Sequence, residues 1–255
     1  MFFDSHAHYN DKCFLEDREK LIVEMFKNDI SGFVCAGYNL PASKDAVLLS
    51  NKFENVFATC GISPNDIDNF KDNDLNVIEK IAIDNKKVVA IGEIGLDYYW
   101  NKENKELQKE LFVKQIEIAN KLNLPIVIHT RDAFIDTIQI LKDNPVLKKG
   151  IFHCCPLNQE LIKEALKLGF YISFSGNITF KNAKSVDCIN LVPMNKILIE
   201  TDSPYLSPEP HRGERNTSEN VKFVAMKIAD VKGLSLENVA RITMENAKTI
   251  FEIMV

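Results

Sequence analysis

The sequence predicts a single-domain (β/α)8 TIM barrel over residues 1–255, on three observations. Eight short apolar segments alternate with longer stretches of helical length, which is typical of β/α units and a parallel sheet. The apolar segments are nearly continuous, as expected for strands that are buried on both faces. No linker or compositional shift divides the chain, and α/β barrels of roughly 250 residues form one domain.

Each predicted strand ends in polar, glycine or titratable residues. The strands cover residues 1–8, 32–37, 55–62, 87–95, 125–129, 150–155, 170–176 and 196–202. Pro125 opens the fifth strand, where its missing N–H least disturbs the ladder. Before it, residues 102–123 predict an amphipathic helix, because Leu107, Leu111, Ile118 and Leu122 recur at helical spacing. Residues 203–220 form the one long irregular segment, and such loops are often functional.

Composition limits the class of protein. The 31 Lys and Arg against 36 Asp and Glu give a net charge of -5, which excludes a basic protein that coats nucleic acid. A composition of 45% hydrophobic and 26% charged residues excludes disorder. The six cysteines include no CxxC pair, so no disulfide framework or thiolate zinc site is indicated. With no membrane span and no leader-like start, we expect a cytoplasmic protein.

Titratable side chains gather at the predicted strand ends. They are His6 and His8 in the first strand, Glu93 and Asp97 in the fourth, His129 in the fifth, His153 in the sixth and Asp202 in the eighth. The carboxyl ends of barrel strands meet at one mouth, where active sites form. Imidazole and carboxylate are ligands that zinc, manganese and iron favour. The pattern therefore predicts a metal site at this mouth.

Each of these residues also has a purely structural interpretation. A histidine in an apolar strand can be a hydrogen-bonded core residue, Glu93 can pair with a base, and Asp202 can cap a helix. Their joint placement favours the metal site, because independent structural uses would scatter them over both barrel ends. Six ligands exceed the three of a catalytic zinc, so we expect two ions, with Glu93 as the candidate bridge. Two metals favour hydrolysis, and no GxGxxG fingerprint supports redox chemistry.

Seven ordered segments carry a resemblance to a known family. They are DSHAHYN at 4–10, GEIGLDYYW at 92–100, LPIVIHTRDA at 124–133, HC at 153–154, ISFSGNITF at 172–180, ILIETDSPYLSP at 197–208 and RGERN at 212–216. Over nearly its whole length the chain resembles the TatD-type metal-dependent deoxyribonucleases, which belong to the amidohydrolase-like barrels.

The resemblance implies a ligand set and a reaction. The two histidines of the first strand bind one ion, those of the fifth and sixth strands bind the second, and Glu93 bridges them. Asp202 completes the first site and orients or deprotonates water, so Asp202 and Glu93 are the expected catalytic residues. A hydroxide activated by two ions, Mg, Mn or Zn, then cleaves the phosphodiester of DNA, single-stranded or at an end. We expect a monomer that acts as an exonuclease.

Two groups of side chains are candidates for substrate contact. Arg131, Arg212 and Arg215 can bind phosphate, because guanidinium matches phosphate oxygens bidentately; surface ion pairing is their alternative role. The aromatic residues 98–100 can stack on unpaired bases or pack the barrel rim.

The chain departs from the family pattern at three places near the mouth. Ser63 and Asn65 stand where many members carry His-Pro-His, HCCPL replaces HCFSG, and RNTS replaces RNEP. The six expected ligands are intact, so these changes bear on substrate preference, and an ester such as D-aminoacyl-tRNA is the alternative substrate. Stoichiometric metal without turnover would indicate a non-catalytic binding barrel.

The cysteine pair beside His153 raises a further alternative, a thiolate ligand or nucleophile. Because consecutive strand residues face opposite sides, we expect Cys155 to share the face of His153 and Cys154 to point into the packing layer.

Overall fold

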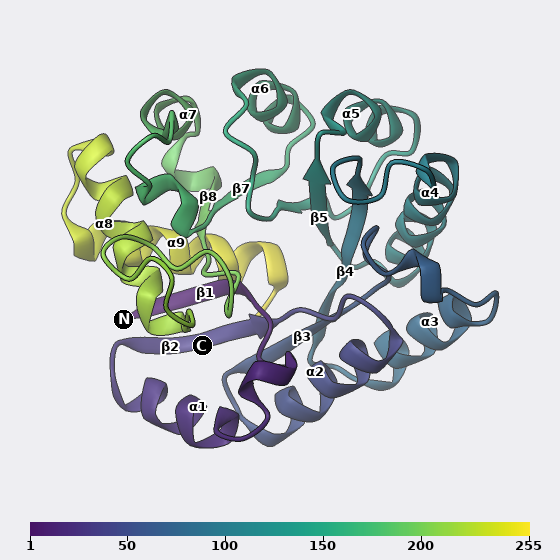
Figure 1. The fold of residues 1–255 in the computed structure, drawn as a ribbon, viewed down its shortest axis with the longest axis horizontal. Helices are drawn as coiled ribbons and strands as arrows, with labels where there is room; N and C mark the ends of the chain where they lie inside the picture. Colours follow the sequence, from purple (N-terminus) through teal and green to yellow (C-terminus); the bar gives the residue numbers. More distant parts are fainter.

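The computed structural model describes residues 1–255 and confirms the predicted barrel (Figure 1). Eight parallel strands form one sheet in the order of the chain. They are β1 Phe2–Ala7, β2 Ile30–Cys35, β3 Val56–Cys60, β4 Val88–Asp97, β5 Ile126–Arg131, β6 Gly150–Phe152, β7 Tyr171–Phe174 and β8 Ile197–Ile199.

Helices surround this sheet on the outside (Figure 1). They are α1 Arg18–Lys27, α2 Leu40–Lys52, α3 Asp74–Asp84, α4 Lys105–Leu122, α5 Phe134–Asp143, α6 Gln159–Lys167, α7 Ser185–Leu191, α8 Val221–Lys232 and α9 Leu236–Phe251. Side-chain caps begin several of them: Asn39 accepts from the Ala42 N–H, and Ser235 accepts from the Asn238 N–H. Gly233 ends α8 in the left-handed conformation that glycine adopts without strain.

Two apolar layers stabilise the barrel. Strand residues such as Phe33 and Ile126 belong to the large cluster that includes the surrounding helices. Their neighbours along the strands, such as Val34 and Val127, belong to a second cluster with Phe251 of α9. The strands are therefore apolar on both faces, as their continuous apolar sequences predict.

The barrel closes between β1 and β8 through a polar seam and not through a regular strand ladder. The carboxylate of Asp4 accepts hydrogen bonds from the backbone N–H of Thr201 at 3.0 Å, the Thr201 hydroxyl at 2.5 Å and the Ser218 hydroxyl at 2.6 Å. Helix α9 also packs against both strands. Burial raises the pKa of Asp4 to about 7. The seam thus fixes the middle of β1 against the segment that follows β8, and Asp4 also accepts from the backbone N–H of His6.

Most strand bounds differ from the sequence prediction by one to three residues, and one helix face differs as well. Strands β6 and β8 end earlier than predicted, because the backbone turns into the left-handed region at Cys154, with φ 39°, and at Asp202, with φ 56°. On α4, Leu107 is exposed, contrary to its predicted place on the apolar face, and Gln108 is buried instead. The Gln108 side chain bonds both the N–H and the carbonyl of Asp97, which explains its burial.

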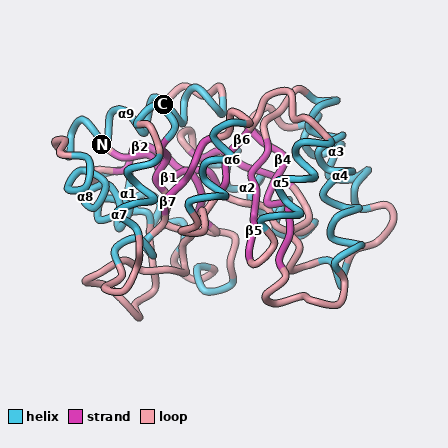
Figure 2. The backbone as a smooth tube through the Cα atoms, turned by 90° about the horizontal axis from the view of Figure 1, so that it is seen from above, coloured by secondary structure: helices cyan, strands magenta, loops and turns pink.

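The loops that follow the strands lie together on one face, and both chain termini lie near the other face (Figure 2). Residues 203–220 are irregular as predicted, apart from a short 3-10 turn at Ser218–Asn220. Asn216 holds this loop through bonds from its amide to the carbonyls of Thr201 and Tyr205. No helix has the length and apolar character needed to cross a membrane.

Candidate metal centre

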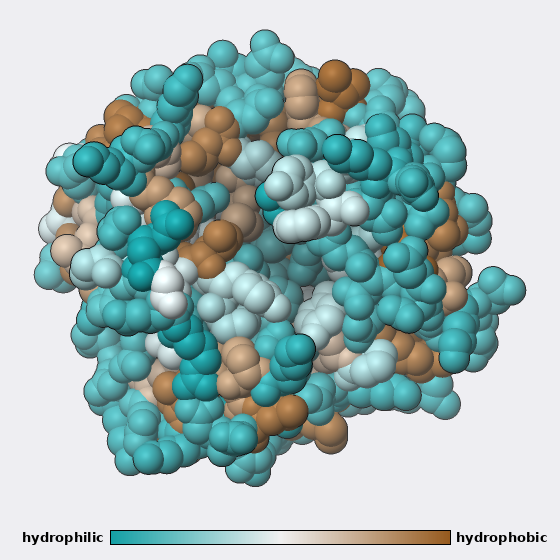
Figure 3. Space-filling view, in the orientation of Figure 1, coloured by the Kyte–Doolittle hydropathy of each residue, from teal (hydrophilic) through white to brown (hydrophobic).

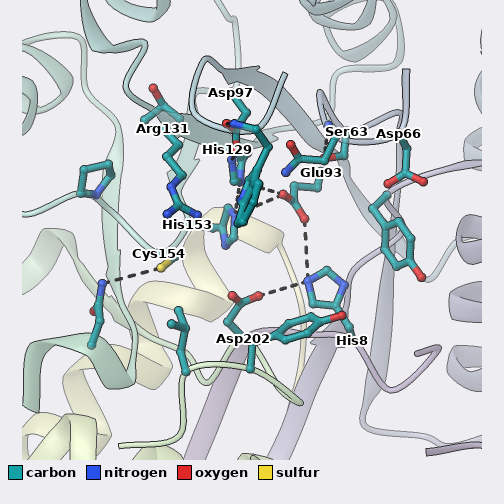
Figure 4. Close-up of a pocket in the computed structure, with 18 residues that line it drawn as sticks. His8, Ser63, Asp66, Glu93, Asp97, His129, Arg131, His153, Cys154 and Asp202 are labelled. Atoms are coloured by element: carbon teal, nitrogen blue, oxygen red, sulfur yellow. Dashed lines mark hydrogen bonds and ion pairs between the residues drawn. The ribbon is translucent and has the colours of Figure 1, made fainter. Parts of the chain in front are cut away.

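Four of the five histidines converge at the carboxyl end of the barrel, as predicted. His6 lies within β1, and His8 follows directly after it; His129 lies within β5 and His153 follows β6. Figure 4 shows the side chains of His8, Glu93, His129, His153 and Asp202 around one space.

The first group of ligand atoms contains His6, His8 and Asp202. The two imidazole Nε2 atoms lie 3.1 Å apart. Asp202 Oδ1 lies 3.1 Å from His8 Nε2 and 3.7 Å from His6 Nε2. Oε2 of Glu93 faces the same pair, at 3.6 Å from His6 and 3.7 Å from His8. Two imidazole nitrogens and two carboxylate oxygens therefore surround one point.

The second group contains His129 and His153. Oε1 of Glu93, the other oxygen of the same carboxylate, lies 3.0 Å from His129 Nδ1 and 3.4 Å from His153 Nε2. The two imidazole nitrogens lie 3.3 Å apart. Glu93 thus gives one oxygen to each pair of histidines, which is the position of a bridging ligand.

The donor set fits divalent cations. Three overlapping groups of side chains each place three ligand atoms within 4.8 Å of one another. Two imidazole nitrogens at this distance need a proton or a cation between them. A combination of imidazole nitrogen and carboxylate oxygen is the ligand set that zinc, manganese and iron favour. The negative charge of the two carboxylates, Glu93 and Asp202, would be balanced by cations in the same space.

The carboxylates and imidazoles of the centre shift one another's pKa. Burial opposes ionisation of Glu93, yet the surrounding histidines, His153 above all, hold its pKa well below the usual value. Burial lowers the pKa of His6, with a contribution from the neighbouring His153. For His153 itself, burial is outweighed by the carboxylates of Glu93 and Glu200, which raise its pKa well above the usual value. Metal binding needs neutral imidazole, so a cation held by His153 would displace its proton.

Two carboxylates that orient the ligands received no role in the sequence analysis. Asp97 Oδ2 accepts from His129 Nε2 at 2.9 Å, which leaves Nδ1 of His129 as the ligand atom. Glu200 is fully buried and lies 3.4 Å from His153 Nδ1, while its Oε1 also accepts from the Cys154 N–H at 2.6 Å. A carboxylate inside the apolar sequence KILIETD is the signal that could have identified Glu200.

The predicted orientation of the two cysteines is wrong. Cys154 lines the cavity and accepts a weak bond from the Asn177 amide at 3.8 Å, whereas Cys155 is buried in the apolar core. The reason is the left-handed backbone at Cys154, which interrupts the alternation of a strand. Burial and the neighbouring carboxylates of Asp202 and Glu200 raise the pKa of the Cys154 thiol, which disfavours a thiolate nucleophile.

The three candidate arginines have different surroundings. Arg131 lines the cavity, and Figure 4 shows it directed toward His153 and Cys154. Arg212 is stacked on the ring of Phe180, 3.7 Å from its centroid. Arg215 is paired with Asp17 at 2.6 Å. Neither Arg212 nor Arg215 lines the cavity.

The centre lies at the bottom of a cavity of about 720 Å³. Figure 3 shows the hollow near the middle of this face, bordered by residues of intermediate hydropathy. Ser63, Asn65 and Pro156, which distinguish this chain from the family pattern, all line it. The departures therefore change the surface that meets a substrate.

A barrel with six imidazole and carboxylate side chains converging at its mouth is the arrangement expected of a metal-dependent hydrolase. The family model described as TatD related DNase matches residues 3–252, so the chain belongs to the TatD family. It is 41% identical to the uncharacterized metal-dependent hydrolase YabD of Bacillus subtilis over 99% of this chain and 100% of that protein. It is 38% identical to the uncharacterized metal-dependent hydrolase YcfH of Escherichia coli K12, over 98% of this chain and 95% of that protein.

The solved structures agree on the fold. The crystal structure of YjjV, a TatD homologue from Escherichia coli K12, superimposes with a TM-score of 0.94 at 23% identity and covers 99% of this chain and 98% of that one.

Proposed function

We propose that this hydrolase is a deoxyribonuclease that cleaves phosphodiester bonds with the help of two divalent cations, Mg²⁺, Mn²⁺ or Zn²⁺. The observation that carries the proposal is the position of Glu93, whose two oxygens each face a different pair of histidines. A centre for one ion needs no carboxylate between two pairs of imidazoles. The DNase description of the matching family model supports DNA as the substrate.

The ligands divide between two positions. One cation would be held by His6, His8 and Asp202, the other by His129 and His153, with Glu93 shared between them. When bound, such cations supply Lewis acidity to phosphoryl oxygens and lower the pKa of water.

Asp202 is placed to accept a proton. Its side chain is 14% exposed and lines the cavity. Burial opposes its ionisation, but the hydrogen bond from His8 and the charges of the nearby histidines lower its pKa. An ionised carboxylate at this position can hold the attacking water and take its proton as the oxygen approaches phosphorus.

Arg131 is placed to bind phosphate. It is the only Lys or Arg among the residues that line the cavity, while four carboxylates line the same space: Asp66, Glu93, Asp97 and Asp202. The protein alone therefore presents a negative cavity to a negative substrate. Guanidinium can donate two hydrogen bonds to a phosphate, and bound cations would offset the remaining repulsion.

The depth of the centre supports action on strand ends. His6, His8, Glu93 and His153 are all buried beneath the cavity opening. A cavity of about 720 Å³ admits a terminal or displaced nucleotide but not an intact duplex. We therefore propose exonucleolytic cleavage of single strands.

The test is degradation of end-labelled single-stranded DNA by metal-stripped protein, with Mg²⁺, Mn²⁺ and Zn²⁺ added back in turn. We expect cleavage only after metal addition, and none by Glu93→Ala. Folding of the variant is checked by circular dichroism. If metal-loaded, folded protein leaves DNA intact, the proposal fails; turnover of D-aminoacyl-tRNA in a parallel reaction would then assign the centre to a carboxylic ester.

A further inference from the structure

Trp100 and Arg131 line one wall of the cavity beside the metal centre, and Tyr99 packs against both of them. The guanidinium carbon of Arg131 lies 3.9 Å from the ring centroid of Tyr99 and 5.5 Å from that of Trp100. The two aromatic rings meet edge to face, with centroids 4.8 Å apart. Trp100 is 68% exposed and Tyr99 46% exposed. We call Tyr99, Trp100 and Arg131 the platform.

The platform is fixed to the metal centre through one carboxylate. Oδ1 of Asp97 accepts from the backbone N–H of Tyr99 at 2.8 Å and of Trp100 at 2.9 Å. Oδ2 of the same side chain accepts from the ligand His129. Asp97 also pairs in register with Arg131 across β4 and β5. The backbone that carries the two aromatic side chains is therefore held in a set position relative to His129.

The neighbouring Tyr98 has a packing role at this turn and is the comparison for the two exposed rings. Its side chain is 9% exposed, and its hydroxyl donates to Asp136 at 2.7 Å. The ring is covered by the ammonium of Lys105, at 4.4 Å from the centroid. Tyr98 thus packs the barrel rim, whereas Trp100 lines the cavity and leaves most of its indole surface in solvent. Large exposed apolar surface at a cavity wall is typical of a binding site.

We infer that the platform binds the nucleobase next to the scissile phosphate and so selects unpaired nucleotides, an inference that rests on the proposed nuclease function. The indole offers a flat face for stacking, and every base has a π-face, so recognition is independent of sequence. Arg131 stabilises the aromatic pair through cation–π contacts, and its guanidinium can also donate hydrogen bonds to a phosphate. A base inside a duplex is stacked on its neighbours and cannot occupy this surface.

Trp100 is the only tryptophan of the chain, so its fluorescence reports from the platform itself. The experiment titrates metal-loaded protein with a short single strand whose phosphorothioate linkages resist cleavage. A matched abasic strand has the same charge and no bases. We expect the normal strand to quench the emission and the abasic strand to bind about tenfold more weakly without quenching, since stacking contributes roughly 1–3 kcal/mol per base. Equal binding and equal quenching by both strands would overturn the inference.

Variants separate stacking from a structural effect. Trp100→Ala should raise KM for single-stranded DNA about tenfold with little change in kcat, and Trp100→Phe should restore most of the affinity. The matched control is Tyr171→Ala, which removes an aromatic ring beside Lys196 at the start of β7, outside the cavity. An unchanged KM in Trp100→Ala would contradict base stacking.

The two proposals fail in different ways. If bases quench the fluorescence but DNA is not cleaved, the inference about the platform stands and the proposed phosphodiester cleavage is wrong. The two results are independent because binding is measured with a strand that resists cleavage. Cleavage of DNA with an unchanged KM in Trp100→Ala would keep the nuclease and reject the platform.

Discussion

The floor and the rim of the cavity are built in opposite ways. The floor consists of the six predicted ligands, His6, His8, Glu93, His129, His153 and Asp202, which five different strands or their ends supply and which are largely buried. The rim consists of Trp100, Arg131 and residues 203–220, which lie on turns, at a strand end or on a loop and include buried as well as exposed positions. The floor leaves little freedom to its side chains, whereas exposed rim residues such as Trp100 and Arg131 can change without disturbing the barrel. We therefore expect the residues of the floor to determine the reaction and those of the rim to determine which substrate binds.

The largest expected effect compares a histidine of the floor with the histidine of the rim. His153→Ala should lower metal-dependent cleavage on the order of 10³-fold and reduce bound metal from two ions to one, because its Nε2 and Glu93 Oε1 belong to one ligand group. His211→Ala should change neither quantity, since His211 pairs only with Glu214 on the exposed loop. Initial rates and metal analysis of gel-filtered protein measure both. Two ions bound to His153→Ala would refute the division of ligands.

A smaller effect is expected where floor and rim meet. Asp97→Asn should weaken metal binding about 10–100-fold, because one amide oxygen cannot serve both His129 and the N–H groups of Tyr99 and Trp100. Competition with a chromophoric chelator measures the affinity. Asp136→Asn is the matched control, since Asp136 pairs with Tyr98 and Lys109 and does not line the cavity. Equal metal affinity in both variants would show that Asp97 serves the turn alone.

The sequence predicted that the floor residues converge, because strand ends are constrained by the barrel; their role as metal ligands stays a prediction. Once eight apolar segments are assigned, the last titratable residue of each must lie at the same mouth, whatever the helices between them do. The same reasoning could not assign Glu200, because its role depends on where the imidazole of His153 turns, and that depends on the left-handed residue Cys154.

The rim was predicted less well because its contacts join segments that are distant in the chain. The pair formed by Arg215 and Asp17 spans loops that no local pattern connects. Likewise, the sequence DYYW does not reveal which ring packs and which stays exposed. The difference arises because Asp136 of α5 accepts a hydrogen bond from the Tyr98 hydroxyl and from neither of the two following aromatic residues.

The smallest effect is expected at Arg215. Its guanidinium donates to both oxygens of Asp17, at 3.0 and 2.6 Å, and to the carbonyl of Cys13 at 2.8 Å, so few donors are left for phosphate. Arg215→Ala should change KM for DNA less than about twofold and stability by about 0–1 kcal/mol, as for other exposed ion pairs. Arg131→Ala should raise KM roughly tenfold, because a charged hydrogen bond to substrate is lost.

Steady-state kinetics on single-stranded DNA and urea denaturation of both variants make this comparison. A tenfold rise of KM in Arg215→Ala at unchanged stability would mean that the Asp17 pair opens when substrate binds. The loop of residues 203–220 would then contact the substrate directly, and the rim would extend from the platform across the cavity mouth to α1.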